Sequence, residues 1–241
     1  LALTNPATIA AGASGTIVVA PSAAVAGSLN STLTLALLSD ARGLFGLTDA
    51  TLAAQTVAVT GAAYDLAQPT YASTALTFGN VRKGGVLAAR SVAFTNTLLT
   101  DAAYQDSLGV LATSSSARLA VANPALLAAG DSANLVVTPS TATAGSLAAT
   151  LTVNLTSDAR GVAGLSDQAL TGGALAVTGG VYDLAQPDHA AALALGNVRV
   201  GTQRNLAVTN RVLAEAAYQD SLAVTATAAN VRLGVVAPVS A

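Results

Sequence analysis

The sequence predicts an all-β protein built from antiparallel β-sandwiches, and three observations carry that prediction. Short segments in which apolar and polar residues alternate recur along the chain, as in "TLTLALL" at 32–38. Clusters of Gly, Pro, Asn and Asp separate these segments and predict turns. About seven such strands fall in every ~115 residues, a density typical of an immunoglobulin-like sandwich.

Period-two alternation places each strand and its buried face. Besides 32–38, the predicted strands are 56–61, 91–96, 107–113, 150–156, 174–179, 205–210 and 221–227. We expect one face of the 32–38 strand to point inward and its equivalent in 150–156 to do the same, because a slip of one residue would expose the whole apolar set. The predicted inward residues are Leu33, Leu35, Leu37, Leu151, Val153 and Leu155, with Thr32, Thr34 and Ala36 outward.

An internal repeat organises the chain. Residues 1–29 match residues 119–147, and "YDLAQP" occurs at both 64–69 and 182–187, which is a spacing of 118. Later in the period the spacing shortens, reaching 114 between Tyr104 and Tyr218. A single coil of a solenoid takes roughly 20–30 residues, so this period corresponds to a whole globular domain. The chain therefore contains two full periods and the opening of a third.

The predicted domain boundaries follow from interpreting "YDLAQP" as a joint. We expect a complete immunoglobulin-like repeat at 70–187, the later part of a preceding repeat at 1–69, and the early part of a following repeat at 188–241. Tyr64 and Tyr182 are expected to be buried at domain ends with bonded hydroxyls, and the motif's proline is expected to stop strand pairing. Boundaries near Ala117 and Val231 are the alternative, and a parallel β-solenoid is the alternative fold.

Composition excludes several classes of function. The chain has 241 residues, of which 52% are hydrophobic and 9% charged, with a net charge of −2 and no cysteine. Disulfides and thiolate metal sites are therefore impossible, and no basic patch indicates nucleic-acid binding. No apolar run approaches the ~20 residues of a membrane helix. Since the sequence has no methionine at all, we expect it to be a processed or excised piece of a longer protein.

The titratable candidates are few, and a structural role is favoured for each. His189 is the only histidine, lies in a predicted linker and has no second histidine to assist it. Asp65 and Asp183 could bind calcium at the joints, but that ion requires six or more oxygens, so capping of the turn is favoured. We predict no catalytic, cofactor-binding or metal-binding residues, no cofactor, and no enzymatic activity.

Four further short motifs are given no chemical role. "SDARG" predicts loops with local ion pairs, Asp40 with Arg42 and Asp158 with Arg160. "YQDS" at 104–107 and 218–221 could supply a serine nucleophile only beside a base, which the first copy lacks. "FGNVRKGG" lacks phosphate-loop spacing and predicts a strand and turn, with Asn80 and Asn197 at positions that tolerate positive φ. "NST" and "NLT", at Asn30 and Asn154, fit the glycosylation sequon.

Several of these motifs together resemble a known family. "LTFGNVRKGG", "VAFTNT" and "YQDSL", followed by "VTGGVYDLAQP", resemble the choice-of-anchor D repeats of exported bacterial proteins, and the resemblance spans nearly the whole sequence twice. The family's modules are immunoglobulin-like and are strung along cell-surface and secreted chains. The resemblance implies export and an extracellular or cell-surface location, and it implies no catalytic residues.

The favoured function is structural: a repeat segment of a bacterial extracellular filament, sheath or surface layer. We expect residues 188–231 of one copy to combine head to tail with residues 1–69 of another, because each part alone would leave open sheet edges. Covalent continuation of the same repeat array is the alternative source of the missing strands. The alternative function is an adhesin or binding module with a carbohydrate- or protein-binding face, although exposed aromatic residues are scarce.

Overall fold

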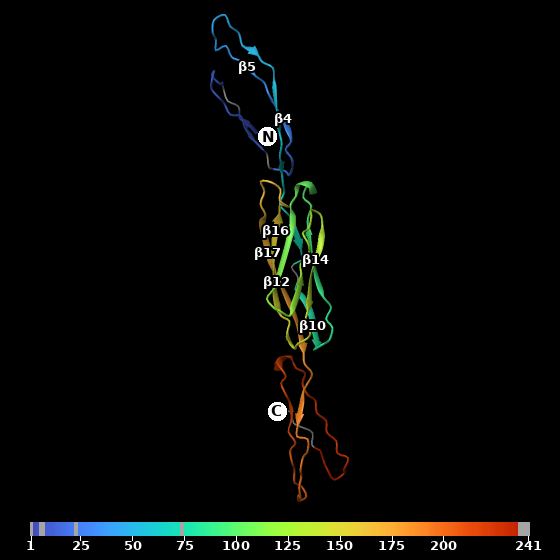
Figure 1. Cartoon of the computed structure of the whole chain (residues 1–241). Coiled ribbons are helices and arrows are strands. Elements are labelled where there is room, and N and C mark those ends of the chain that lie inside the picture. Colours follow the sequence, from blue (N-terminus) through green and yellow to red (C-terminus); the bar gives the residue numbers. More distant parts are fainter. Residues whose placement is uncertain (1, 5–7, 22–23, 73–74, 236–241) are drawn as a thin grey trace.

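The computed structural model describes residues 2–4, 8–21, 24–72 and 75–235, and it is nearly all β. The chain forms an elongated molecule in which a thick central sandwich lies between thinner N-terminal and C-terminal parts (Figure 1). The predicted fold class, an all-β sandwich, is confirmed. The two short helical elements are the 3-10 turns η1 (Ala102–Tyr104) and η2 (Ala216–Tyr218).

Two sheets form the central sandwich. The first has the order β10-β17-β16-β12, with β15 also paired to β17, and the second has the order β13-β14-β11-β9. The strands of the first sheet are β10 (Leu76–Arg82), β12 (Ser107–Ser114), β15 (Gly145–Ser146), β16 (Ala149–Asp158) and β17 (Gln168–Tyr182). Those of the second sheet are β9 (Pro69–Tyr71), β11 (Arg90–Asn96), β13 (Leu119–Ala122) and β14 (Ser132–Pro139).

One strand pair departs from the antiparallel prediction. β10 pairs with β17 in parallel, with Leu76 opposite Val177 and Arg82 opposite Tyr182. These are the first long strand and the last strand of the sandwich, and both run toward the C-terminal part of the molecule. Because the chain enters the sandwich at one end and leaves it at the other, its first and last strands can lie side by side and run in the same direction. The alternation of apolar and polar residues within a strand does not indicate the direction of its neighbour.

The core lies between these two sheets. Leu151, Val153 and Leu155 are at most 2% exposed, while Thr152 and Asn154 between them are exposed, so the predicted register of this strand is confirmed. The fully buried side chains in the same core come from both sheets and from the segment between β15 and β16, and include Phe94, Leu108, Leu135, Leu147, Leu175, Val137 and Val181. All of the buried hydrophobic residues among those described fall between Ala67 and Val181.

The N-terminal part contains four two-stranded pairs rather than a sandwich. The pairs are β1 (Ala2–Thr4) with β2 (Val18–Ala20), β3 (Gly27–Ser28) with β8 (Ala62–Ala63), β4 (Ser31–Leu35) with β7 (Gln55–Val59), and β5 (Leu38–Ser39) with β6 (Ala50–Thr51). Within the described residues, none of these strands joins the two central sheets.

Burial in β4 follows the predicted alternation only in part. Leu33 and Leu35 are half-buried and their neighbours Thr32 and Thr34 are exposed, as predicted. Leu37 is 39% exposed, so the inward prediction is wrong for this residue. The physical reason is that no second sheet covers this pair of strands, and the alternating face therefore stays open to solvent.

The C-terminal part is equally thin. Its strands are β18 (Pro187–His189) and β19 (Val208–Asn210), which pair with each other. The predicted strand at 221–227 is wrong, since no strand is present there. Its counterpart β12 is a strand because β16 lies beside it, and nothing occupies the corresponding position next to 221–227 among the described residues.

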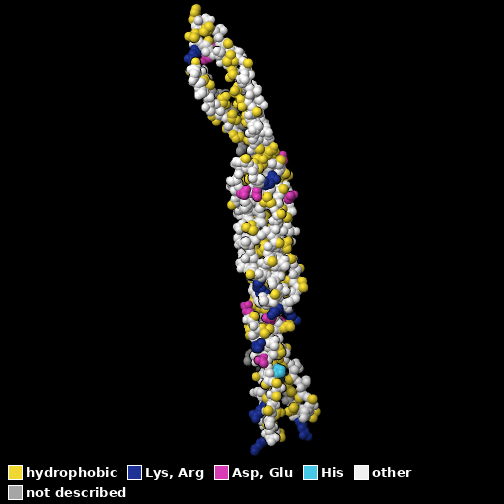
Figure 2. All heavy atoms as spheres, in the orientation of Figure 1, with side chains coloured by type: hydrophobic (Ala, Val, Ile, Leu, Met, Phe, Trp, Pro, Cys, Tyr) yellow, Lys and Arg dark blue, Asp and Glu magenta, His cyan; other side chains and the backbone are white. Residues whose placement is uncertain are grey.

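Charged side chains gather at the two ends of the central sandwich on the face seen in Figure 2, whereas the flank between them carries few charges. In the residues that the structure describes, no helix combines the length and apolar character needed to cross a membrane. The charged ends of the central sandwich coincide with the two "YDLAQP" motifs, so these motifs are the candidate functional sites.

Candidate functional site: two matching joints

Each "YDLAQP" motif is held by the "YQD" motif that follows it in the chain. The amide nitrogen of Asp65 donates to the carbonyl oxygen of Tyr104 (2.8 Å), and the amide of Asp106 donates to the carbonyl of Asp65 (2.9 Å). The result is a parallel bridge between Asp65 and Gln105. The "YDLAQP" segment is therefore fixed by backbone hydrogen bonds to the central sandwich that follows it.

The second joint repeats this arrangement. The amide of Asp183 donates to the carbonyl of Tyr218 (2.8 Å), the amide of Asp220 donates to the carbonyl of Asp183 (2.9 Å), and Asp183 is bridged in parallel to Gln219. Both joints thus use equivalent residues and closely similar distances.

A buried asparagine organises the first joint. The side-chain oxygen of Asn96 accepts from the amide of Gln68 (2.9 Å) and from Nε2 of Gln105 (3.2 Å), and its Nδ2 donates to the carbonyls of Asp106 (2.9 Å) and Leu127 (3.2 Å). Asn96 is 0% exposed, and four hydrogen bonds use its full capacity. The side chain of Asn96 therefore connects the linker at Gln68, the "YQD" segment at Asp106 and the segment that contains Leu127.

Gln105 completes this polar cluster. Its Nε2 also donates to the carbonyl of Thr97 (2.8 Å), and its Oε1 accepts from the amide of Leu99 (2.9 Å). The side chain is 1% exposed, so each of these bonds is made in a setting where water cannot replace it.

The same cluster occurs in the second joint with one contact fewer. Oδ1 of Asn210 accepts from Gln186 (2.8 Å) and Gln219 (3.0 Å), and its Nδ2 donates to the carbonyl of Asp220 (2.9 Å). Gln219 in turn donates to the carbonyl of Arg211 (2.9 Å). Asn210 is half-buried rather than buried, because the strands that would cover it are not beside it.

The joint tyrosines pack in pairs. Tyr64 meets Tyr104 edge to face at 5.7 Å between ring centroids, and Tyr182 meets Tyr218 at 5.4 Å. Both Tyr64 and Tyr182 are half-buried, so the predicted substantial burial is met in part. Each ring covers its partner at the edge of the joint instead of entering the core.

The motif's proline begins a strand rather than ending pairing. Pro69 is the first residue of β9 and lies opposite Asn96, and Pro187 is the first residue of β18 and lies opposite Asn210. The prediction that proline stops pairing is therefore wrong. Proline is tolerated at the first position of an edge strand, because the missing N–H is not needed there, and β9 lies at the edge of its sheet.

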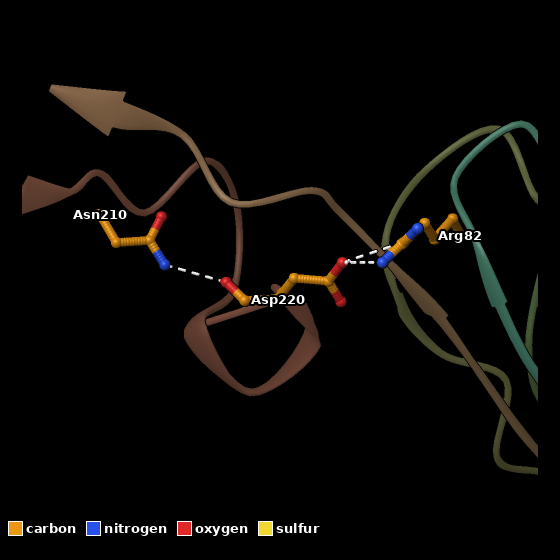
Figure 3. Close-up of polar contacts among 3 residues, drawn as sticks. All are labelled: Arg82, Asn210 and Asp220. Carbon is orange, nitrogen blue, oxygen red and sulfur yellow. Dashed lines mark hydrogen bonds and ion pairs between the residues drawn. The ribbon is translucent and has the colours of Figure 1, made fainter. Parts of the chain in front are cut away.

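Two ion pairs connect the central sandwich to the C-terminal part. Nη2 of Arg82 lies 2.8 Å from Oδ2 of Asp220, with Nε of Arg82 also donating to that oxygen at 3.0 Å (Figure 3). Nζ of Lys83 lies 3.6 Å from Oδ1 of Asp183. The basic side chains are 68% and 52% exposed, so screening by water and salt keeps each pair weak.

A buried carboxylate–hydroxyl contact lies at the first joint. Oγ of Ser157 donates to Oδ2 of Asp106 (2.7 Å) and accepts from the amide of Ala67 (2.8 Å). Ser157 is 0% exposed and lies in β16, so this contact connects a late strand of the sandwich to the linker that enters it.

The other candidate residues lie apart from these clusters. His189 is exposed, with Nδ1 3.0 Å from the carbonyl of Ala190. Ser107 is 3% exposed at the start of β12, whereas Ser221 is exposed. Asn30 accepts a hydrogen bond from the amide of Gly61 (3.0 Å), and Asn154 is an exposed residue of β16. Across the described ranges, no group of three or more His, Asp or Glu residues is placed to hold a metal ion.

The "SDARG" loops are turns rather than ion pairs. Oδ1 of Asp40 accepts from the amide of Arg42 and Oδ1 of Asp158 from the amide of Arg160, each at 2.7 Å. Both arginines have positive φ, 54° and 53°. The predicted ion pairs are wrong because the short aspartate side chain bonds the backbone two residues on, which is the geometry that supports a left-handed residue.

The positive φ expected near "FGNVR" falls one residue earlier than predicted. Gly79 has φ 77° and Gly196 has φ 64°, while Asn80 and Asn197 are not in that region. Glycine has no Cβ to oppose this conformation, so it takes the position in preference to its asparagine neighbour.

Sequence reasoning missed the asparagine and glutamine that hold the joints. Their signal was present, because "TN" at 95–96 and 209–210 and "YQD" at 104–106 and 218–220 are identical in both periods. Identical polar residues next to predicted strands, with no chemical partner in the sequence, indicate buried structural hydrogen bonds. Comparison with known proteins adds no relative: no family model and no curated protein sequence matches the chain.

Proposed function

We propose that this chain is a structural repeat segment of a bacterial extracellular filament, sheath or surface layer, in which β-sandwich modules assemble head to tail. The observation that carries the proposal is the matching of the two joints. A linker that is fixed by the same hydrogen bonds each time sets the same relation between neighbouring modules, and repetition of one relation generates a linear array.

The polar clusters support a structural role. In the first joint, Asn96 and Gln105 connect the linker to the module by buried hydrogen bonds that water cannot replace. A flexible tether would need none of these contacts. The extracellular and bacterial parts of the proposal rest on the resemblance of the sequence motifs to choice-of-anchor D repeats.

Head-to-tail assembly is supported by the open surfaces at both ends. Apolar side chains line the N-terminal part, which is hollowed in Figure 2, and further apolar side chains stay exposed in the C-terminal part, including Leu193, Leu206 and Val208. Large exposed apolar surfaces mark interaction sites. Completion by strands from another copy, or from a continuing repeat array, covers both.

Electron microscopy of the purified chain at high concentration tests the proposal. We expect unbranched filaments one sandwich wide, together with an average mass in light scattering that rises with protein concentration. Particles that stay monomeric and separate at every concentration would contradict head-to-tail assembly.

A further inference from the structure

The open groove of the C-terminal part is an unfilled sandwich core. Leu206, Val208, Leu222 and Val224 line it, together with Pro187, His189 and the small residues 223, 225 and 226. Their counterparts one period earlier are Val92, Phe94, Leu108 and Val110, all at most 7% exposed in the central sandwich. By contrast, Leu206 is 46% exposed and Val208 is 38% exposed. The groove therefore has the lining of a core without the strands that fill one.

The N-terminal strands have the complementary property. In the central sandwich, the side chains that fill the core include Leu135, Leu151, Val153 and Leu175, each at most 1% exposed. Their counterparts in the N-terminal part are Ile17, Leu33, Leu35 and Val57, of which Val57 is 47% exposed and the others are half-buried. These strands therefore carry core side chains without a second sheet to cover them.

One molecule cannot bring these two surfaces together by itself. The N-terminal and C-terminal parts lie at opposite ends of the elongated molecule, with the whole central sandwich between them (Figure 1). The N-terminal part of a second copy matches the groove residue by residue.

The central sandwich gives the register of that contact. β12 pairs antiparallel with β16, with Leu111 opposite Asn154. The same pairing carried to the equivalent positions sets Thr225 of one copy opposite Ala36 of the next. Similarly, the parallel pair Leu76 and Val177 becomes Leu193 opposite Val59.

We propose that residues 8–21 and 24–63 of a second copy fill the groove of residues 187–226 in this register, with Ser39 of the incoming copy bonded to Asp220. This inference rests on the proposed head-to-tail assembly and adds the segment, the register and the polar contact that fixes it.

Ser39 is the residue that makes the register specific. It is the counterpart of Ser157, whose hydroxyl bridges Asp106 and the amide of Ala67 in the central sandwich. In the new junction the equivalent partners are Asp220 and the amide of Ala185. Arg82 contacts Oδ2 of Asp220, so the second carboxylate oxygen can accept from the incoming hydroxyl. A shift by two residues would remove the hydroxyl from a carboxylate that the junction buries, which is costly.

Disulfide trapping tests the register, because the natural chain has no cysteine. Ala36→Cys and Thr225→Cys are made in separate full-length chains, which are mixed under mild oxidation. We expect a mixed disulfide dimer that neither variant forms alone. The matched control pairs Ala36→Cys with Ala223→Cys, which lies on the same face two residues away. Its yield should be about ten-fold lower, because diagonal neighbours lie about 7–8 Å apart and disulfides need Cα atoms within about 7 Å.

Ser39→Ala tests the polar contact separately. Ser39 is exposed in the free chain, so the variant should fold as the natural chain does. We expect it to associate about ten-fold more weakly, since a hydrogen bond to a buried carboxylate is lost. An unchanged association constant would overturn the role of Ser39.

The outcomes separate this inference from the proposed function. Faster trapping by Ala223→Cys, or homodimers of Ala36→Cys alone, would overturn the register or the polarity. If light scattering shows assembly but no mixed disulfide forms, the inference is overturned. The chains would then assemble through other surfaces. If light scattering shows no assembly, the head-to-tail assembly of separate chains that the proposed function includes fails as well.

Discussion

Replacing Asn96 with leucine should destabilise the central sandwich strongly. The substitution keeps the branching at Cγ but removes four hydrogen bonds at 0% exposure. At about 1 kcal/mol for each bond, and with roughly 1 kcal/mol regained from the added apolar surface, the loss in the free energy of unfolding is about 3 kcal/mol.

The repeat supplies a matched control in Asn210→Leu. Asn210 makes the equivalent bonds to Gln186, Gln219 and Asp220, but it is half-buried, so water can satisfy the groups that lose a partner. This variant should leave the main unfolding transition within about 1 kcal/mol of the natural chain.

The assay is urea unfolding followed by far-ultraviolet circular dichroism, at a concentration where the chain is monomeric. Equal effects of the two variants would refute the role given to burial. A loss below about 1 kcal/mol for Asn96→Leu would refute the view that its four bonds hold the joint together.

Three further substitutions test separate parts of the structure. Gly179→Ala should lower the free energy of unfolding by about 2–3 kcal/mol in thermal unfolding, since φ is +151° and a Cβ would lie 2.8 Å from the carbonyl oxygen of Gly79. The control Gly61→Ala should be near neutral, because the nearest atom to its Cβ would be 3.9 Å away, and equal losses for the two variants would contradict this packing. Tyr182→Ala should cost at most about 2 kcal/mol in chemical unfolding, because the half-buried ring loses mainly its contact with Tyr218, and a loss of about 4 kcal/mol would indicate a fully packed ring. The double variant Arg82→Gln and Lys83→Gln should change the free energy of unfolding by less than about 1 kcal/mol, yet it should widen the range of angles at the second joint measured by small-angle X-ray scattering. An unchanged scattering profile would show that the two ion pairs do not stiffen this joint.

Alternation of apolar residues was sufficient to predict the fold class and the buried face of β16, because each of Leu151, Val153 and Leu155 meets a second sheet. The same pattern failed at Leu37, since burial depends on a partner layer that the strand itself does not encode. It also could not predict the parallel pairing of β10 with β17, which follows from the path of the chain through the domain.

The sequence indicated the position of each joint but not the hydrogen bonds that hold it. The repeated motif indicated where a linker lies, whereas the residues that hold it, Asn96 and Gln105, come from strands and turns far from the motif. In "SDARG", opposite charges two residues apart suggested an ion pair, but backbone hydrogen bonding of the aspartate was the stronger local interaction.

Amide hydrogen exchange at residues 222–226 tests the central claim most directly. These amides belong to a segment that forms no strand in this structure, while their counterparts in β12 are paired with β16. If a second copy completes the groove, their protection should rise with protein concentration toward that of 108–112. Amides of 33–37, in β4 and directly after it, should gain protection in parallel. Exchange at 222–226 that stays fast and independent of concentration, while 108–112 remain protected, would contradict completion of the sandwich by a second copy.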